Sequence, residues 1–127
     1  MDRLLILAAA AAALLILVRL ARALAGSRTA RARALGAGEV WSALGAAPDG
    51  RPAVVLFTTP SCAECVTQRT LLNGVRVIEV DAAARPEVAS RFGVLTAPTT
   101  AVLGPDGRVR ALNHGFAPAE RLAAQLA

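Results

Sequence analysis

The chain has 127 residues, enough for one domain plus an appendage. Its formal net charge is +5, but five arginines between positions 19 and 38 account for the whole excess, and residues 39–127 carry eight arginines against eight acids. This distribution argues against a nucleic-acid-binding groove across the domain and favours a basic cluster beside a membrane.

The first element is an apolar segment, Leu4–Val18, without a charged residue. Its fifteen residues would rise about 22 Å as a helix, less than the roughly 30 Å of hydrocarbon in a bilayer. If the helix extends to Ala25, it is long enough to span the bilayer, provided that the side chains of Arg19 and Arg22 reach the headgroups. We therefore predict a single-pass transmembrane anchor over residues 1–25, inserted through residues 4–25. The alternatives are a signal peptide cleaved after Ala23–Ala25 and a buried helix of a soluble protein.

Residues 26–38 are basic, rich in small side chains and without apolar periodicity, which predicts a juxtamembrane linker. Many more arginines follow the apolar segment than precede it. The positive-inside rule then places the third part, a folded domain over residues 39–127, in the cytoplasm. An extracytoplasmic domain is the alternative.

The domain alternates strand and helix patterns. The apolar run Ala53–Thr58 is typical of a strand buried on both faces. The turn signal GPDG at 104–107 predicts a hairpin. In chain order we predict a helix at 39–46, a strand at 53–58, a helix at 62–72, a strand at 75–80, a helix at 86–92, strands at 99–103 and 108–112, and a helix at 118–126. This order predicts a compact α/β sandwich whose first two strands are parallel.

The only two cysteines, Cys62 and Cys65, lie two residues apart where the first strand gives way to a helix. Free N–H groups and the positive end of the helix dipole stabilise a thiolate there, so Cys62 is the expected nucleophile. Cys65, one turn later, can attack a mixed disulfide formed at Cys62. Ser61 or Thr58 is the expected helix cap. Two inert buried cysteines, or a zinc site with His114 as the one other soft ligand, are the alternatives.

Residues 53–127 resemble a thioredoxin domain. The resemblance rests on CAEC at Cys62–Cys65, FGV at 92–94, APT at Ala97–Thr99 and the hairpin sequence GPDGRV at 104–109. It implies a thioredoxin-like three-layer α/β/α sandwich with a mixed central sheet, preceded by the one transmembrane helix. It also implies that Pro98 is the family's cis-proline facing the redox pair, and that Thr96, Ala97 and Pro98 bind the substrate chain.

The predicted function is therefore that of a membrane-anchored thiol–disulfide oxidoreductase, with Cys62 as the attacking thiol and Cys65 as the resolving thiol. Protein disulfides or oxidised thiols are the expected substrates, and an upstream thiol reductant is the expected partner. No metal, dissociable cofactor or nucleic acid is implied, since the Cys62–Cys65 disulfide is itself the redox centre. Two alternatives stay open: an outward-facing oxidoreductase of disulfide traffic or cytochrome maturation, and a non-catalytic binding module on a thioredoxin scaffold.

The redox segment departs from the WCGPC usual in thioredoxin, since Ser61 replaces Trp and Ala63-Glu64 replaces Gly-Pro. The charge of Glu64 disfavours a thiolate beside it and predicts a more reducing couple. The buried Asp and Lys that assist proton transfer in thioredoxin align with Leu56 and Ile78, neither of which can move a proton.

Three other residues have expected places in the domain. His114 is expected at the surface where the hairpin ends, with a general base as the alternative. Glu79 is expected to be exposed at the end of a strand, with a buried acid as the alternative. Trp41 is expected in the core.

Overall fold

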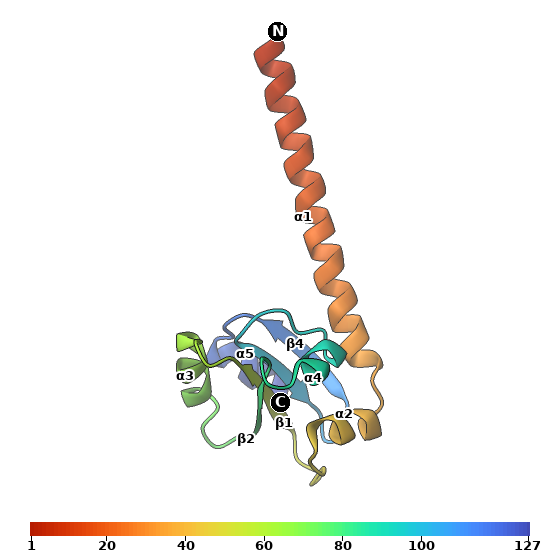
Figure 1. The fold of residues 1–127 in the computed structure, drawn as a ribbon, viewed down its shortest axis with the longest axis vertical. Coiled ribbons are helices and arrows are strands. Elements are labelled where there is room, and N and C mark those ends of the chain that lie inside the picture. The colour runs from red at the N-terminus through yellow and green to blue at the C-terminus, as the bar shows by residue number, and fades with distance from the viewer.

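A long helix leads into an α/β domain in the computed structural model, which describes all residues 1–127 (Figure 1). The elements are α1 Asp2–Ala34, α2 Ala37–Leu44, β1 Ala53–Thr58, α3 Ala63–Thr70, β2 Arg76–Asp81, α4 Pro86–Arg91, β3 Thr99–Leu103, β4 Val109–His114 and α5 Ala119–Leu126. The bounds of β1 and β3 are those predicted, and the other domain elements start and end within two residues of the prediction.

The four strands form one mixed sheet in the order β2-β1-β3-β4. β1 runs parallel to β2 and antiparallel to β3, and β3 and β4 form the antiparallel hairpin. All six residues of β1 are buried, because this strand is central and has helices on both sides. The predicted parallel pair and hairpin are confirmed.

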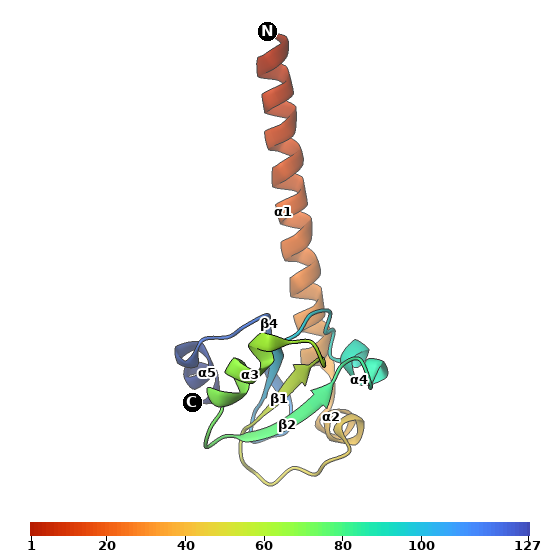
Figure 2. The ribbon, with the colours of Figure 1, turned by 60° about the vertical axis from the view of Figure 1, so that its left-hand side comes forward.

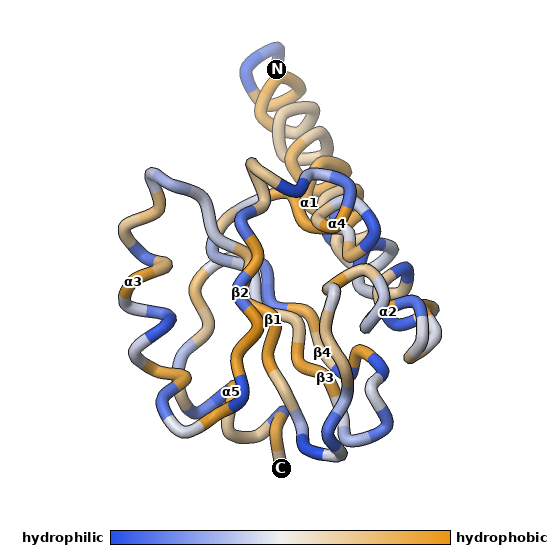
Figure 3. Tube along the Cα trace, turned by 60° about the horizontal axis from the view of Figure 1, so that its bottom comes forward, coloured by the Kyte–Doolittle hydropathy of each residue, from blue (hydrophilic) through white to orange (hydrophobic).

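Helices cover both faces of the sheet: α3 and α5 lie on one side, and α2 and α4 on the other (Figures 2 and 3). Side chains of β1 alternate between the two layers. Val55 and Phe57 join the larger core cluster, where the Phe57 and Phe92 rings lie 5.3 Å apart, whereas Val54 and Leu56 join the smaller one. The predicted three-layer sandwich is confirmed.

Helix α1 extends far beyond the domain (Figure 1), and its apolar residues up to Leu24 are exposed. The most apolar 18-residue window has a mean hydropathy of 2.7, so by length and composition the helix could cross a membrane. The helix does not end at Ala25 but continues through most of the predicted linker to Ala34.

The last turns of α1 pack against the domain along one helical face. Ala25, Arg28, Thr29 and Ala32 are half-buried or buried there, at the three- and four-residue spacing of one face of a helix. Ala32 is completely buried within the larger core cluster. The packed unit therefore starts before Glu39, where the folded domain was expected to begin.

The docked part of α1 packs against β4, one of the two edge strands of the sheet. Val102 pairs with Ala111 and Leu103 with Val109, so Arg110 is the extra residue of a bulge. The carbonyl of Arg110 accepts two hydrogen bonds from the Arg33 guanidinium, at 3.1 and 2.9 Å. The helix thus protects an otherwise open sheet edge.

Trp41 anchors α2 at the opposite end of the sheet from the cysteines. Its indole packs against the hairpin turn so closely that a Cβ at Gly107 would lie 2.6 Å from its Nε1 atom. The Arg76 guanidinium lies 4.9 Å from the centre of the Trp41 ring. Trp41 is buried, as expected of a core residue.

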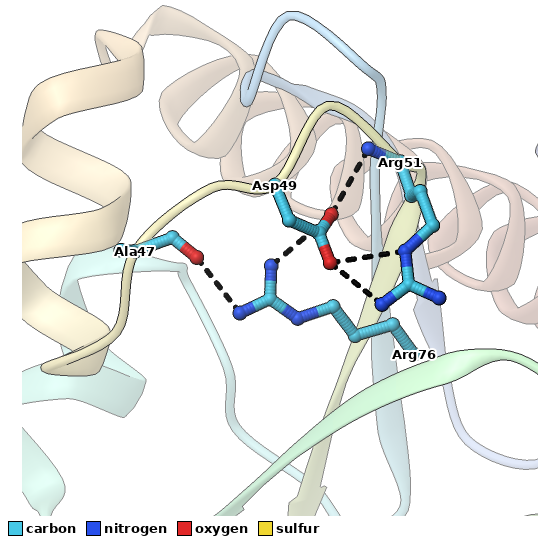
Figure 4. A network of polar contacts seen from close by, with 4 residues as sticks. All are labelled: Ala47, Asp49, Arg51 and Arg76. Carbon is cyan, nitrogen blue, oxygen red and sulfur yellow. Dashed lines mark hydrogen bonds and ion pairs between the residues drawn. The ribbon is translucent and has the colours of Figure 1, made fainter.

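The loop between α2 and β1 is held by a polar network of Ala47, Asp49, Arg51 and Arg76 (Figure 4). Asp49 forms an ion pair with Arg51 at 2.7 Å and a longer one with Arg76 at 3.4 Å. Arg76 also donates to the carbonyl of Ala47 at 2.7 Å. Hydrogen bonds from the side chain and backbone of Arg51 lower the pKa of Asp49 to about 2.

Candidate functional site

The two cysteines lie at the carboxyl end of β1, where the chain turns into α3. The backbone N–H of Cys62 donates to the carbonyl of Thr59 at 3.2 Å and closes the turn. The carbonyl of Thr58, the last residue of β1, accepts from Ala82 N–H at 2.8 Å just beyond β2. The parallel pair of strands thereby fixes the position from which α3 starts.

Cys62 and Cys65 are joined by a disulfide, with their Cα atoms 5.4 Å apart. Cys62 is half-buried, whereas Cys65 is only 2% exposed. A thiol approaching from solvent therefore meets Cys62 first. The role of Cys62 as the attacking residue stays a prediction.

Cys62 is also the N-cap of α3, and its Sγ atom accepts a hydrogen bond from the Cys65 N–H at 3.2 Å. The prediction that Ser61 or Thr58 caps this helix is wrong. The helix starts one residue later than expected, so the cap position falls on Cys62, and Thr58 stays buried in β1.

The loop between α4 and β3 forms the wall opposite the cysteines. Leu95, Thr96 and Ala97 line a hollow of about 460 Å³ together with Cys62 and its neighbours Thr59, Ser61, Ala63 and Glu64. The Ala97–Pro98 peptide bond is cis, and the Thr99 hydroxyl donates to the Thr96 carbonyl at 2.6 Å. The structure thus brings Thr96 and Ala97 to Cys62, while Pro98 is buried and does not line this hollow.

A second hollow of about 610 Å³ contains both cysteines and lies toward β2. Its polar residues include Arg69, Glu79 and Asp81. Arg69 donates to Glu79 with Nε at 2.9 Å from Oε2, and this pairing raises the pKa of Arg69. Glu79 is exposed, as expected, but its ion pair with Arg69 was not anticipated.

The position that aligns with the buried Asp of thioredoxin is apolar in this chain. Leu56 is completely buried in the smaller core cluster and pairs in the sheet with Glu79. The prediction that Ile78 takes the place of the buried lysine is wrong, because Ile78 packs against the larger cluster on the other face of the sheet. Val77 and Glu79 share the face of Leu56, and the carboxylates of Glu79 and Asp81 both line the hollow that contains the two cysteines.

His114 ends β4 opposite Thr99, the residue that follows Pro98. It is half-buried, and its Nε2 atom is buried without a hydrogen-bond partner. Burial, and then the positive charge of Arg28, lower the pKa of His114. His114 does not line either hollow that contains Cys62, so the structure gives no geometric support for a general-base role.

Gln68 is a site-supporting residue that sequence reasoning missed. It is completely buried on α3, where its Nε2 donates to the Ala117 carbonyl at 3.0 Å and its Oε1 accepts from the Ala117 N–H at 2.7 Å. These bonds hold the segment after β4 against the helix that carries the cysteines. The available signal was its spacing, since Gln68 lies three residues after Cys65 and so on the same face of the helix.

No protein-family model matches the sequence, and no curated protein matches it either. Among solved structures, a mutant thioredoxin from Halobacterium salinarum has a TM-score of 0.58 and 18% identity, covering 70% of this chain and 80% of that one. Fasciola hepatica thioredoxin has a TM-score of 0.52 and 22% identity, covering 62% and 81%. Mitochondrial thioredoxin 3 from Saccharomyces cerevisiae, in its oxidised form, has a TM-score of 0.52 and 20% identity, covering 62% and 79%.

These likenesses agree with the element order and the mixed sheet. The chain therefore has a thioredoxin-like fold, with a CxxC-spaced disulfide where β1 meets α3.

Proposed function

We propose that the chain is a membrane-anchored thiol–disulfide oxidoreductase that reduces or exchanges protein disulfides. One observation carries the proposal: the Cys62–Cys65 disulfide lies at the carboxyl end of the central strand β1 in a thioredoxin-like sheet, with the more exposed Cys62 facing a hollow. An inert structural disulfide has no need for an accessible sulfur beside an open groove.

The reaction starts from the reduced pair. The Cys62 thiolate attacks one sulfur of the substrate disulfide, forms a mixed disulfide and releases the other substrate sulfur as a thiolate, which takes up a proton from water. The Cys65 thiolate then attacks Cys62, forms the Cys62–Cys65 disulfide and releases the second substrate thiolate. Two electrons pass from the pair to the substrate, and an upstream dithiol reductant returns them.

Substrate binding falls to the loop between α4 and β3. Thr96 and Ala97 share the hollow with Cys62, so an extended substrate segment can lie along their backbone with its sulfur toward Cys62. Pro98 shapes this loop from a buried position.

The N-terminal half of α1 is the proposed anchor. Its exposed apolar surface has no partner within the chain, and five arginines follow the apolar run. By the positive-inside rule we place the domain in the cytoplasm, where thiol pairs are kept reduced and the pair would act as a reductant. A reporter fused after Ala127 tests this placement, and a reporter active only outside the cytoplasm would support the outward-facing alternative.

The test of activity is reduction of insulin disulfides by the full chain in detergent micelles, with a dithiol reductant as electron source. We expect Cys62→Ser to lose the catalysed rate and Ser42→Ala, at an exposed position of α2 away from the site, to keep it. A wild-type rate no faster than that of Cys62→Ser would favour the binding-module alternative.

A further inference from the structure

The docked end of α1 forms one wall of the groove that leads to the redox pair. Arg28 and Arg31 line a hollow of about 420 Å³ together with residues of α4 and of the loop before β3. Four of its lining residues also line the hollow that contains Cys62: Thr59, Leu95, Thr96 and Ala97. The two hollows therefore adjoin along these four residues, between the end of α1 and Cys62, and we call them together the redox groove.

The redox groove faces the direction in which α1 leaves the domain. The start of α3 and the loop between α4 and β3 both lie at the end of the domain from which α1 extends (Figures 1 and 2). With the N-terminal half of α1 in a bilayer, this end of the domain faces the membrane surface.

The orientation of the domain is set by packing. Ala32 is completely buried and Arg33 is bonded to the bulge in β4. Near the groove, a Cβ at Gly93, whose φ is +70°, would lie 3.1 Å from the Cβ of Arg28. These contacts hold the end of α1 against β4 and the groove, so the helix cannot act as a loose tether.

The distance of the redox groove from the hydrocarbon core of the bilayer follows from the length of the helix. Arg28 lies three residues after Ala25, where the predicted span ends, which adds about 4.5 Å of helical rise. Each headgroup layer is about 5–8 Å thick, since a bilayer is about 40–45 Å thick in all around a core of about 30 Å. The α1 end of the groove therefore lies within the headgroup layer.

The redox groove has mixed chemistry beside Cys62 and is basic at the α1 end. Beside Cys62 it is lined by Leu95, which is 70% exposed, and by Glu64. Arg28 and Arg31 have no ion-pair partner, and no acidic residue lines their hollow. This end of the groove can accept a carboxylate.

We propose that the redox groove takes the juxtamembrane segment of a second membrane protein, whose disulfide lies within about two helical turns of the bilayer, with an acidic residue beside its cysteine. The inference rests on the proposed function and names its substrate class. Cys62 attacks the juxtamembrane sulfur of that disulfide and releases the other sulfur as a thiolate, while Arg28 and Arg31 bind the neighbouring carboxylate.

The test uses the reduced full-length Cys65→Ser variant, in which the mixed disulfide at Cys62 cannot be resolved. In neutral-lipid vesicles it meets a transmembrane peptide whose one cysteine, three residues beyond the apolar stretch, is disulfide-linked to a small thiol dye. A second peptide carries the cysteine after a flexible 15-residue spacer, on average about 20 Å further out. Attack by Cys62 releases the dye and joins peptide to protein, so both dye release and the adduct are measured.

We expect the near peptide to react about tenfold faster than the far one. Its cysteine lies at the same distance from the bilayer as the groove, so its effective concentration at Cys62 is higher. A seven-residue polar helical insertion between Ala25 and Gly26 is the matched variant. The insertion moves the groove about 10 Å farther from the bilayer. It hardly rotates the domain about the helix axis, since seven residues make almost two turns. The insertion should remove the preference for the near peptide.

The charge of the groove is tested with near peptides that carry Glu or Gln next to the cysteine. Wild-type protein should react faster with the Glu peptide than with the Gln peptide. Arg31→Glu should reverse this preference, and Arg108→Glu, at the far hairpin turn, should leave it unchanged. Loss of the Glu preference in anionic-lipid vesicles would show that the arginines bind lipid headgroups and would overturn the carboxylate site.

The outcomes separate this inference from the proposed function. Equal rates for the near peptide, the far peptide and a soluble peptide linked to the same dye would overturn the membrane-facing groove and leave the oxidoreductase standing. No reaction of Cys62 with any of the three would overturn both.

Discussion

Replacing Gln68 with leucine should destabilise the domain, because the side chain satisfies two buried backbone groups at once. Both the N–H and the carbonyl of Ala117 bond to the Gln68 amide, at 2.7 and 3.0 Å, and Gln68 is completely buried. Leucine nearly fills the same space but offers neither a donor nor an acceptor. Each orphaned buried group costs about 1–3 kcal/mol, and after the gain from burying leucine we expect a net loss of about 2–4 kcal/mol.

The loss can be measured by urea unfolding of the full chain in detergent micelles. Trp41 is the only tryptophan and is buried in the layer opposite α3, so its fluorescence reports unfolding of the whole domain. With a slope of about 1–1.5 kcal/mol/M, the urea midpoint should fall by roughly 2 M.

Thr67→Ala is the control for this measurement, since Thr67 is the exposed neighbour on the same helix. We expect it to change stability by less than about 0.5 kcal/mol. If Gln68→Leu were no more destabilising than Thr67→Ala, Ala117 would have to be satisfied by other partners, and the assignment of Gln68 as the link between α3 and this segment would be refuted.

Three further predictions concern charge. Glu64→Gln should make the redox couple more oxidising by about 10–20 mV in equilibrium with glutathione, because an exposed charge pair contributes about 0.5–1 kcal/mol and 30 mV corresponds to about 1.4 kcal/mol; an unchanged or more reducing couple would contradict the role given to Glu64. His114 is the only histidine, and in an NMR titration its pKa should lie below 6.5 and rise toward that value in Arg28→Gln. Since the unfolded chain binds this proton more readily, stability should fall as the pH drops below 6.5, and an Arg28→Gln titration identical to wild type would place Arg28 away from His114. The pKa of Asp49, about 2, lies below its unfolded value of 3.8, so its stabilising contribution is present above pH 3.8 and is lost as the pH falls toward 2. Asp49→Asn should therefore flatten the fall of the urea midpoint between about pH 4 and 2, and a curve parallel to wild type would argue against the pairing with Arg51.

The strands β1 and β3 could be predicted because their signals are local. Each is an unbroken run of residues that suit a buried strand, bounded by proline or glycine. The position of the cysteine pair could be predicted equally well, because the pair directly follows the same apolar run. The helix cap could not be predicted, because whether Ser61 or the sulfur of Cys62 caps the helix depends on where the first turn of α3 begins.

Features that depend on register or on distant partners could not be predicted. The face on which Ile78 lies is decided by pairing with β1, and an error of one residue in the alignment moves a side chain across the sheet. The bonds between Gln68 and Ala117 join positions 49 residues apart, so nothing near Gln68 in the sequence indicates its partner.

The segment expected to be a juxtamembrane linker shows how a helix can dock without an apolar stripe of large residues. Its contact face includes small side chains such as Thr29 and Ala32, which bring the helix close to β4 but give little hydrophobic signal in the sequence. The partner of Arg33 is a bulge carbonyl, which sequence patterns do not reveal. Removal of residues up to 38 would uncover the β4 edge and take Ala32 out of the core. A soluble form of the domain should therefore keep α1 from about Ala25 onward, because anchor and domain share this last part of the helix.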